Sequence, residues 1–171
     1  VGIVGPRMPT PYGLDVARRL ARDFAPSMTV VSGAALGIDS MAHKEALDSS
    51  GRTIAVLGCG IDQNYPARNE ALRARIASGE GGAIVSMFPP GTKPLPGNFP
   101  QRNFVLAGLC LAVVIVEASA TSGALVTARA AADEGRPVYA VPGDINRRNS
   151  EGANRLLRDG AIACTSAADV M

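Results

Sequence analysis

The chain has 171 residues, of which 47% are hydrophobic and 19% are charged, and this is enough to bury one sizeable core. The composition excludes a coiled coil, a solenoid and a disordered tail, and no apolar run approaches the ~20 residues that span a bilayer. Seventeen basic and 15 acidic residues leave a net charge of +2, so any binding of phosphates must be local rather than driven by a diffuse basic surface.

Short apolar or β-branched runs recur along the chain and alternate with segments of helical periodicity. In the first such segment, Val16, Leu20 and Phe24 fall on one side of a helix. Strands that are apolar on both faces and separated by helices predict an extended Rossmann-like, doubly wound α/β fold, with a mostly parallel sheet and helices on both faces. The predicted strands are Val1–Val4, Thr29–Val31, Thr53–Leu57, Ala83–Val85, Ala112–Val116 and Val138–Val141.

Two segments depart from this alternation. Residues Met87–Pro100 (MFPPGTKPLPGNFP) are rich in proline, which excludes a regular helix or a central strand and predicts an ordered loop. Residues Asp144–Gly152 (DINRRNSEG) are polar and predict a mobile connection. Because no stretch has the composition of an interdomain linker, we expect residues 1–171 to form a single domain.

The sequence gives little support for a metal, a cofactor or a catalytic centre. The three cysteines lie far apart without a CxxC pair, and His43 is the single histidine, so neither a zinc site nor a disulfide scaffold is expected. Gly5 and Gly58 do not begin a GxGxxG fingerprint, and no GxxxxGK[ST] motif is present. We therefore expect no cofactor and no catalytic residue, and we interpret His43 as a structural or surface residue.

Small residues follow the predicted strands at the ends where ligands bind in open α/β sheets. Such residues let a ligand approach the backbone, and the N-termini of the following helices offer N–H groups to anions. The pattern predicts a phosphate-bearing ligand at this edge. The residues concerned are Gly5, Ser32 and Gly33, Gly58 to Gly60, Ser86, Glu117, and Pro142 with Gly143.

An ordered set of motifs resembles the DNA-processing protein A (DprA/Smf) family. SGAALGID at 32–39 is similar to the SGxAxGID signature of that family, and GCG (58–60), SMFPPG (86–91), FPQRN (99–103), AVPG (140–143) and GANRLLRDGA (152–161) follow in order. The resemblance covers essentially the whole chain. It implies a Rossmann-like core that binds single-stranded DNA, protects incoming DNA and helps load a RecA-type recombinase in natural transformation.

The resemblance also implies which residues hold the DNA. Arg7 and Arg102 are expected at the rim of the sheet, within reach of phosphates, and Phe99 is expected to stack on a base. Many relatives have Arg at the positions of Leu36 and Phe104 and Glu at the position of Met87, so the resemblance leaves the strength of the basic pocket open in this chain. The full implied set is Gly5, Arg7, Ser32, Gly33, Lys93, Phe99, Arg102, Asn103 and Ser122.

Further expectations concern partners and context. The resemblance implies a homodimer through the C-terminal elements, with Leu156, Leu157 and Ile162 at the interface and the recombinase surface overlapping it. A fully buried C-terminal helix is the alternative. The flanking N- and C-terminal modules that family members often carry are absent from this sequence, so the chain is expected to be the core alone. The cysteine usage is typical of a cytoplasmic protein, and no membrane association is expected.

Two other functions remain alternatives. One is a LOG-type phosphoribohydrolase, which cleaves the base from a nucleoside monophosphate with a PGGxGTxxE motif. The corresponding stretch here, Ser122–Ala128, lacks a glutamate in the catalytic place. The other is a sensor of small nucleotides without catalysis, because a crevice that holds backbone phosphates can also hold a free nucleotide.

Overall fold

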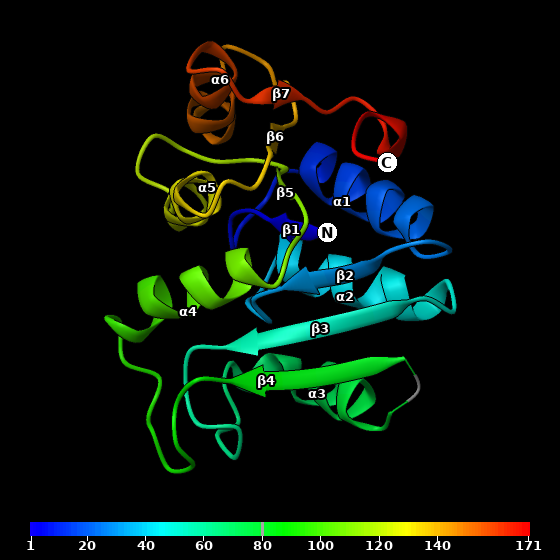
Figure 1. The fold of residues 1–171 in the computed structure, drawn as a ribbon, viewed down its shortest axis with the longest axis vertical. Coiled ribbons are helices and arrows are strands. Elements are labelled where there is room, and N and C mark those ends of the chain that lie inside the picture. The colour runs from blue at the N-terminus through cyan, green and yellow to red at the C-terminus, as the bar shows by residue number, and fades with distance from the viewer. Residues whose placement is uncertain (80) are drawn as a thin grey trace.

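The computed structural model describes residues 1–79 and 81–171, and it contains one sheet of seven strands (Figure 1). The strand order is β4-β3-β2-β1-β5-β6-β7, and every described pair is parallel. The strands are β1 Gly2–Val4, β2 Thr29–Ser32, β3 Arg52–Leu57, β4 Gly82–Ser86, β5 Val113–Ile115, β6 Val138–Ala140 and β7 Ile162–Ala163.

Helices cover both faces of the sheet, so the predicted doubly wound fold is confirmed. Side chains from α1 and α2 pack on one face around Ile3 and Val30, whereas α4 and α5 pack on the other around Val4 and Val31. This alternation follows from the period of two in a strand, which turns neighbouring residues to opposite faces. The helices are α1 Pro11–Phe24, α2 Ile38–Asp48, α3 Glu70–Ala77, α4 Asn98–Gly108, α5 Gly123–Asp133 and α6 Glu151–Arg158.

The six predicted strands all occur, with ends that differ by at most one residue. The seventh strand, β7, was not predicted, because two residues at the sheet edge carry no periodic pattern. The polar segment after β6 contains the 3-10 turn Arg148–Ser150 and the first residues of α6. It is tied to the neighbouring loop by the Ala118 N–H, which donates to the Asn149 carbonyl at 2.8 Å.

Within the described residues, none of the helices is long and apolar enough to cross a membrane. The arrowheads of β2, β3 and β4 point to the left in Figure 1 and mark the carboxyl edge of the sheet. The loops that follow β1, β2 and β3 meet there with the beginnings of α4 and α5. The candidate site lies at this edge.

Candidate functional site

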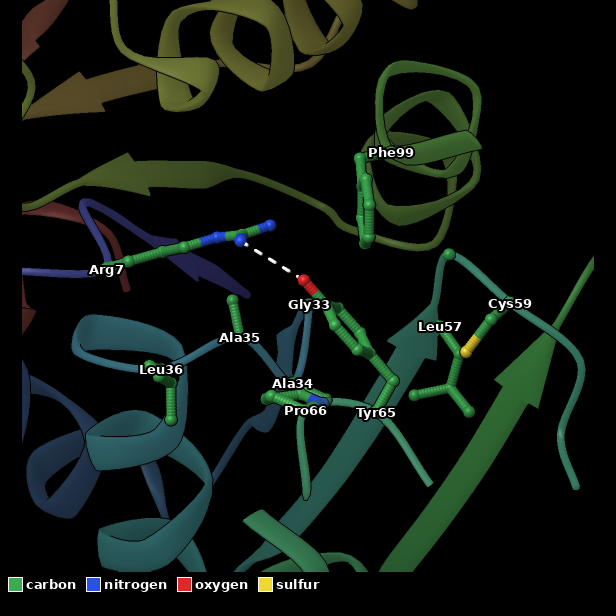
Figure 2. A pocket seen from close by; sticks show the side chains of 11 residues that line it. Arg7, Gly33, Ala34, Ala35, Leu36, Leu57, Cys59, Tyr65, Pro66 and Phe99 are labelled. Atoms are coloured by element: carbon green, nitrogen blue, oxygen red, sulfur yellow. Dashed lines mark hydrogen bonds between the residues drawn. The ribbon is translucent and has the colours of Figure 1, made fainter. Parts of the chain in front are cut away.

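Two adjoining cavities lie at the carboxyl edge, and they share Arg7, Ala35 and Phe99 in their walls. The smaller cavity measures about 70 Å³ and the larger about 290 Å³. The smaller one is lined mainly by apolar groups from the ends of β2 and β3 and from the loops that follow them, and Gly58 is one of its lining residues. Figure 2 labels the others: Gly33, Ala34, Leu36, Leu57, Cys59, Tyr65 and Pro66. The larger one lies between the loop after β1 and the first turns of α4 and α5.

Arg7, Tyr65 and Phe99 form one contact group above the smaller cavity (Figure 2). The guanidinium carbon of Arg7 lies 5.3 Å from the Phe99 ring centroid, and Arg7 Nη1 donates to the Tyr65 hydroxyl at 3.4 Å. The Tyr65 and Phe99 centroids are 5.8 Å apart with an interplanar angle of 43°. Three segments far apart in the sequence therefore supply one cation and two aromatic rings to the same place.

Gly58 explains how the Phe99 ring can lie over the end of β3. A Cβ atom at position 58 would come within 2.7 Å of Phe99 Cδ1, closer than real Cβ atoms approach. Phe99 is the second residue of α4, which starts directly after the proline-rich loop. The ring is half-buried and lines both cavities, so it is accessible without being a fully exposed side chain.

Arg102 lies below the rim and not on it, which corrects the expected position. The side chain is buried, and its Nη1 donates to the backbone carbonyls of Gly33 and Val56. Its Nε donates to the Asn103 side chain at 3.1 Å. The reason is helical geometry: position 102 lies on the inward side of α4, facing the ends of β2 and β3. Arg102 thus joins α4 to the sheet, while part of it still lines the larger cavity.

Arg102 faces a second buried charge, the Asp39 carboxyl in the first turn of α2. Burial raises the pKa of Asp39, against the effects of the Arg102 charge and of the Ala35 N–H, which donates to this carboxylate. Burial lowers the pKa of Arg102, and Asp39 opposes this shift. Each charge therefore offsets part of the cost of burying the other.

The N-terminus of α5 forms another wall of the larger cavity. Ser122 caps this helix by accepting from the Ala124 N–H at 3.3 Å, and Asn103 donates to the Gly123 carbonyl at 3.5 Å. The first turn of α5 and Arg7 thus face one cavity from different sides. Free N–H groups of a helix N-terminus beside a guanidinium form a favourable environment for a phosphate.

The remaining predicted residues occupy different positions. Ser32 is fully buried and donates to the Ile3 carbonyl at 2.6 Å, so its hydroxyl joins two strands beneath the cavities. Gly33 contributes backbone to the smaller cavity, and Gly5 to the larger one. A Cβ atom at Gly5 would collide with Ile38 of α2. Lys93 is exposed in the proline-rich loop, and its carbonyl accepts from the Asn98 side chain at 3.1 Å.

Tyr65 is the site residue that sequence reasoning missed. It lies in the segment between β3 and α3, directly before Pro66, and its ring forms one side of the smaller cavity. The available signal was its position in a loop that follows a predicted strand end at Gly58 to Gly60. An aromatic residue in such a loop can reach the same edge as Phe99.

The other reactive groups near this edge have structural partners. His43 is buried and bonded to Thr53 at 2.6 Å, and Glu117 accepts from the Thr10 N–H at 3.0 Å. Cys59 lines the smaller cavity, and burial raises the pKa of its thiol. Residues 1–79 and 81–171 contain no group of three or more His, Cys, Asp or Glu side chains placed to hold a metal ion. The geometry suits binding of an anion and an aromatic ring.

The sequence matches one protein family over its whole length. The sequence profile of the family described as DNA recombination-mediator protein A matches residues 1–171. Protein Smf of Escherichia coli is 42% identical over 172 residues, which is 100% of this chain and 46% of Smf. This chain therefore spans about half the length of that relative.

Two solved structures are also similar. DNA processing protein A from Streptococcus pneumoniae superposes with a TM-score of 0.92 at 39% identity, covering 99% of this chain and 59% of that one. DNA processing protein A from Helicobacter pylori, whose structure is described as showing a unique single-stranded DNA binding mode, gives a TM-score of 0.89 at 33% identity. It covers 99% of this chain and 76% of that one.

Proposed function

Because the chain belongs to the DNA recombination-mediator protein A family, we propose that it binds single-stranded DNA at the carboxyl edge of its sheet. The observation that carries the proposal is the contact of Arg7 with Phe99 at the boundary of the two cavities. There a cation and an accessible aromatic ring lie beside the N-terminus of α5. Phosphates and bases are the two chemical groups that such a combination recognises.

Each side chain has a distinct task in this proposal. Arg7, the first turn of α5 with Ser122, and Asn103 bind phosphates, and Phe99 stacks on a base. Arg102 acts as a positioning residue, because its bonds to the Gly33 and Val56 carbonyls fix the walls of both cavities. Gly5 and Gly33 present their backbone to the DNA, and the Ser32 hydroxyl joins β1 and β2 beneath the cavities. Lys93 lies on the outer loop and offers the DNA a further positive charge.

The proposed preference for single strands follows from stacking. A base that stacks on Phe99 must first leave its neighbours, and duplex DNA keeps its bases paired and stacked internally. Stacking on an aromatic side chain contributes ~1–3 kcal/mol per base. Duplex DNA keeps the phosphate contacts but lacks this stacking energy. The relative from Helicobacter pylori, described as binding single-stranded DNA, supports this reading.

The biological role proposed for the chain goes one step further. Residues 1–171 act as a single DNA-binding core in the cytoplasm, protect incoming single strands and help load a RecA-type recombinase. We place a homodimer interface at the C-terminal elements. Ile162 on the edge strand β7 is 49% exposed, Leu157 is half-buried, and Leu156 packs against the core around α5.

The protein acts in this proposal by binding and not by catalysis. Burial raises the pKa of the Cys59 thiol, and Glu117 accepts from the Thr10 N–H, so both reactive side chains at the edge have structural environments. Incubation with AMP should therefore release no free adenine. Multiple turnovers at enzyme-like rates would show a phosphoribohydrolase instead.

Binding of a labelled thymidine oligomer, followed by fluorescence anisotropy, tests the proposal. We expect tighter binding of the single strand than of the duplex, and a shallow salt dependence with a slope on the order of −2 to −3, from three or four contacts at ~0.7 each. Phe99→Ala should reduce the preference for single strands. Phe104→Ala, which removes an exposed ring from the same helix, is the matched control. Equal affinity for both DNA forms would contradict stacking on Phe99.

A further inference from the structure

Residues 144–152 begin at the carboxyl edge of the sheet, where β6 ends, and lead into α6. The Asp144 side chain accepts from the Asn146 N–H at 2.9 Å and closes the first turn of this segment. A 3-10 turn follows, and Asn149 lies at its centre. Asn149 is absent from the walls of both cavities, so it is not itself part of the proposed DNA site.

Asn149 nevertheless joins two loops that carry parts of that site. Its side-chain Nδ2 donates to the Met8 carbonyl at 3.1 Å, and its own carbonyl accepts from the Ala118 N–H at 2.8 Å. Met8 directly follows Arg7 in the loop after β1. Ala118 lies in the loop that leads from β5 to Ser122 and the N-terminus of α5. Both bonds therefore lead to groups that line the larger cavity.

The bond to the loop after β5 has a firm basis. Ala118 is fully buried, and its carbonyl accepts from the Gly152 N–H of α6 at 2.7 Å. A Cβ atom at position 152 would lie 2.6 Å from the Ser119 carbonyl oxygen and 2.9 Å from that of Ala118, so this close approach requires glycine. The main chain of Asn149 is thus fixed relative to the loop that leads to α5.

The loop after β1 is held less firmly on its other side. There the Ile38 N–H of α2 donates to the Pro6 carbonyl at 3.4 Å, which is long for a hydrogen bond. The Met8 side chain is 86% exposed, so it adds little packing. In the part of the chain that the structure describes, Asn149 supplies the one hydrogen bond from a side chain to the main chain of this loop. That bond therefore holds the loop one residue beyond Arg7.

We propose that Asn149 is a positioning residue, which sets the distance between Arg7 and the N-terminus of α5 across the larger cavity. The inference rests on the proposed function and assigns Asn149 no contact with DNA. Two groups that bind one phosphate backbone must have a separation that matches it. Fixing that separation before the strand arrives lowers the cost of ordering the groups on binding.

Two asparagines three residues apart provide the test. Asn149→Ala removes the donor to Met8, whereas the matched control Asn146→Ala removes an amide whose partner is Asp144 in the same segment. With a labelled thymidine oligomer in fluorescence anisotropy, we expect Asn149→Ala to bind about fivefold more weakly than the wild type, the effect of one hydrogen bond. Asn146→Ala should bind like the wild type. Both bonds are exposed, so both variants should unfold at urea concentrations close to that of the wild type.

The Arg7→Ala background distinguishes positioning from direct contact. When Arg7 is absent, Asn149→Ala should change the affinity by less than about twofold. The magnitude of the salt slope of Asn149→Ala should also fall toward that of Arg7→Ala.

Three results would overturn the positioning role and leave DNA binding intact. The first is wild-type affinity in Asn149→Ala. The second is an equal loss in Asn146→Ala, which would reveal a general effect of the segment. The third is a loss that persists undiminished in Arg7→Ala, which would show that Asn149 contacts DNA itself. A wild-type protein that binds no thymidine oligomer would instead overturn the proposed function, and this inference with it.

Discussion

The Arg7 guanidinium lies over the ring of Phe99, with 5.3 Å between its central carbon and the ring centroid. The two side chains proposed to bind phosphate and base are thus in contact before DNA arrives. Their contributions to DNA affinity should therefore be coupled. In a double-mutant cycle of Arg7→Ala and Phe99→Ala with a thymidine oligomer, we expect a coupling energy of ~0.5–2 kcal/mol.

The same titrations separate charge from stacking. Arg7→Ala should reduce the magnitude of the salt slope by about 0.7, the value for one phosphate contact on a single strand. Phe99→Ala should leave the slope unchanged and lower the affinity. Additivity of the two substitutions within ~0.3 kcal/mol would show that the contact between them has no role in binding.

Arg102 should contribute mainly to stability. Arg102→Met removes the positive charge that favours the ionised form of the buried Asp39, and it removes the side-chain donor to the carbonyls of Gly33 and Val56. Leaving a buried polar group without its partner costs ~1–3 kcal/mol in the free energy of unfolding, measured by urea denaturation. Arg129→Met, at a side chain that is 85% exposed, is the control and should unfold like the wild type. Adding Asp39→Asn to Arg102→Met should recover part of the loss.

Gly13 should not tolerate a side chain. A Cβ atom there would lie 2.5 Å from the Glu117 carboxyl carbon, and Glu117 also accepts from the Thr10 backbone N–H. We expect Gly13→Ala to lower the free energy of unfolding by ~1–3 kcal/mol. Gly108→Ala, in an open position of α4, should raise it by ~0.4–1 kcal/mol. Similar melting curves for the two variants would contradict the assigned role of Gly13.

His43 should make the fold less stable in acid. Burial lowers the pKa of His43 to about 3, below the ~6.5 of the unfolded chain, so the unfolded state binds more protons between these values. Stability is therefore lost as the pH falls from ~6.5, by ~2 kcal/mol at pH 5. The raised pKa of Asp39 acts in the opposite direction on acidification. Comparison with His43→Gln isolates the histidine, and equal pH slopes in the two proteins would rule out its contribution.

The proposed dimer is tested at its exposed residues. Ile162→Glu and Leu157→Glu should each convert the dimer to a monomer in sedimentation velocity, because a charge would be buried in the interface. Ile145→Glu, at an 87% exposed position in the loop after β6, should remain dimeric. Leu156 is unsuitable for this experiment, because it packs against the core. A wild-type protein that sediments as a monomer would contradict the proposed homodimer.

The sequence predicted the architecture because strands and helices carry periodic patterns that local physics enforces. The runs around Ile3, Val31 and Val114 are apolar on both faces, which is the condition for a parallel sheet between helices. The strand β7 was not predicted, because two residues at the sheet edge carry no periodic pattern of apolar side chains. The edge location of the site followed from small residues after the strands.

Side-chain directions within the site could not be predicted in the same way. Arg102 and Phe99 lie three residues apart on one helix, yet the Arg102 guanidinium donates to carbonyls of the sheet whereas the Phe99 ring lies between the two cavities. Tyr65 reaches the site through a loop whose path depends on tertiary contacts. Spacing in a sequence places a residue on an element, but packing decides whether its charge faces solvent or a carbonyl.

The loop that carries Arg7 is fixed at both ends. Gly5 packs against Ile38 at its start, and Thr10 is bonded to Glu117 at its end. Uncovering Phe99 therefore requires rotation of one exposed side chain and no movement of the backbone. Such rotations take picoseconds to nanoseconds, far less time than a diffusional encounter with a strand at micromolar concentration. Capture of DNA should accordingly follow a single kinetic phase whose rate rises linearly with DNA concentration.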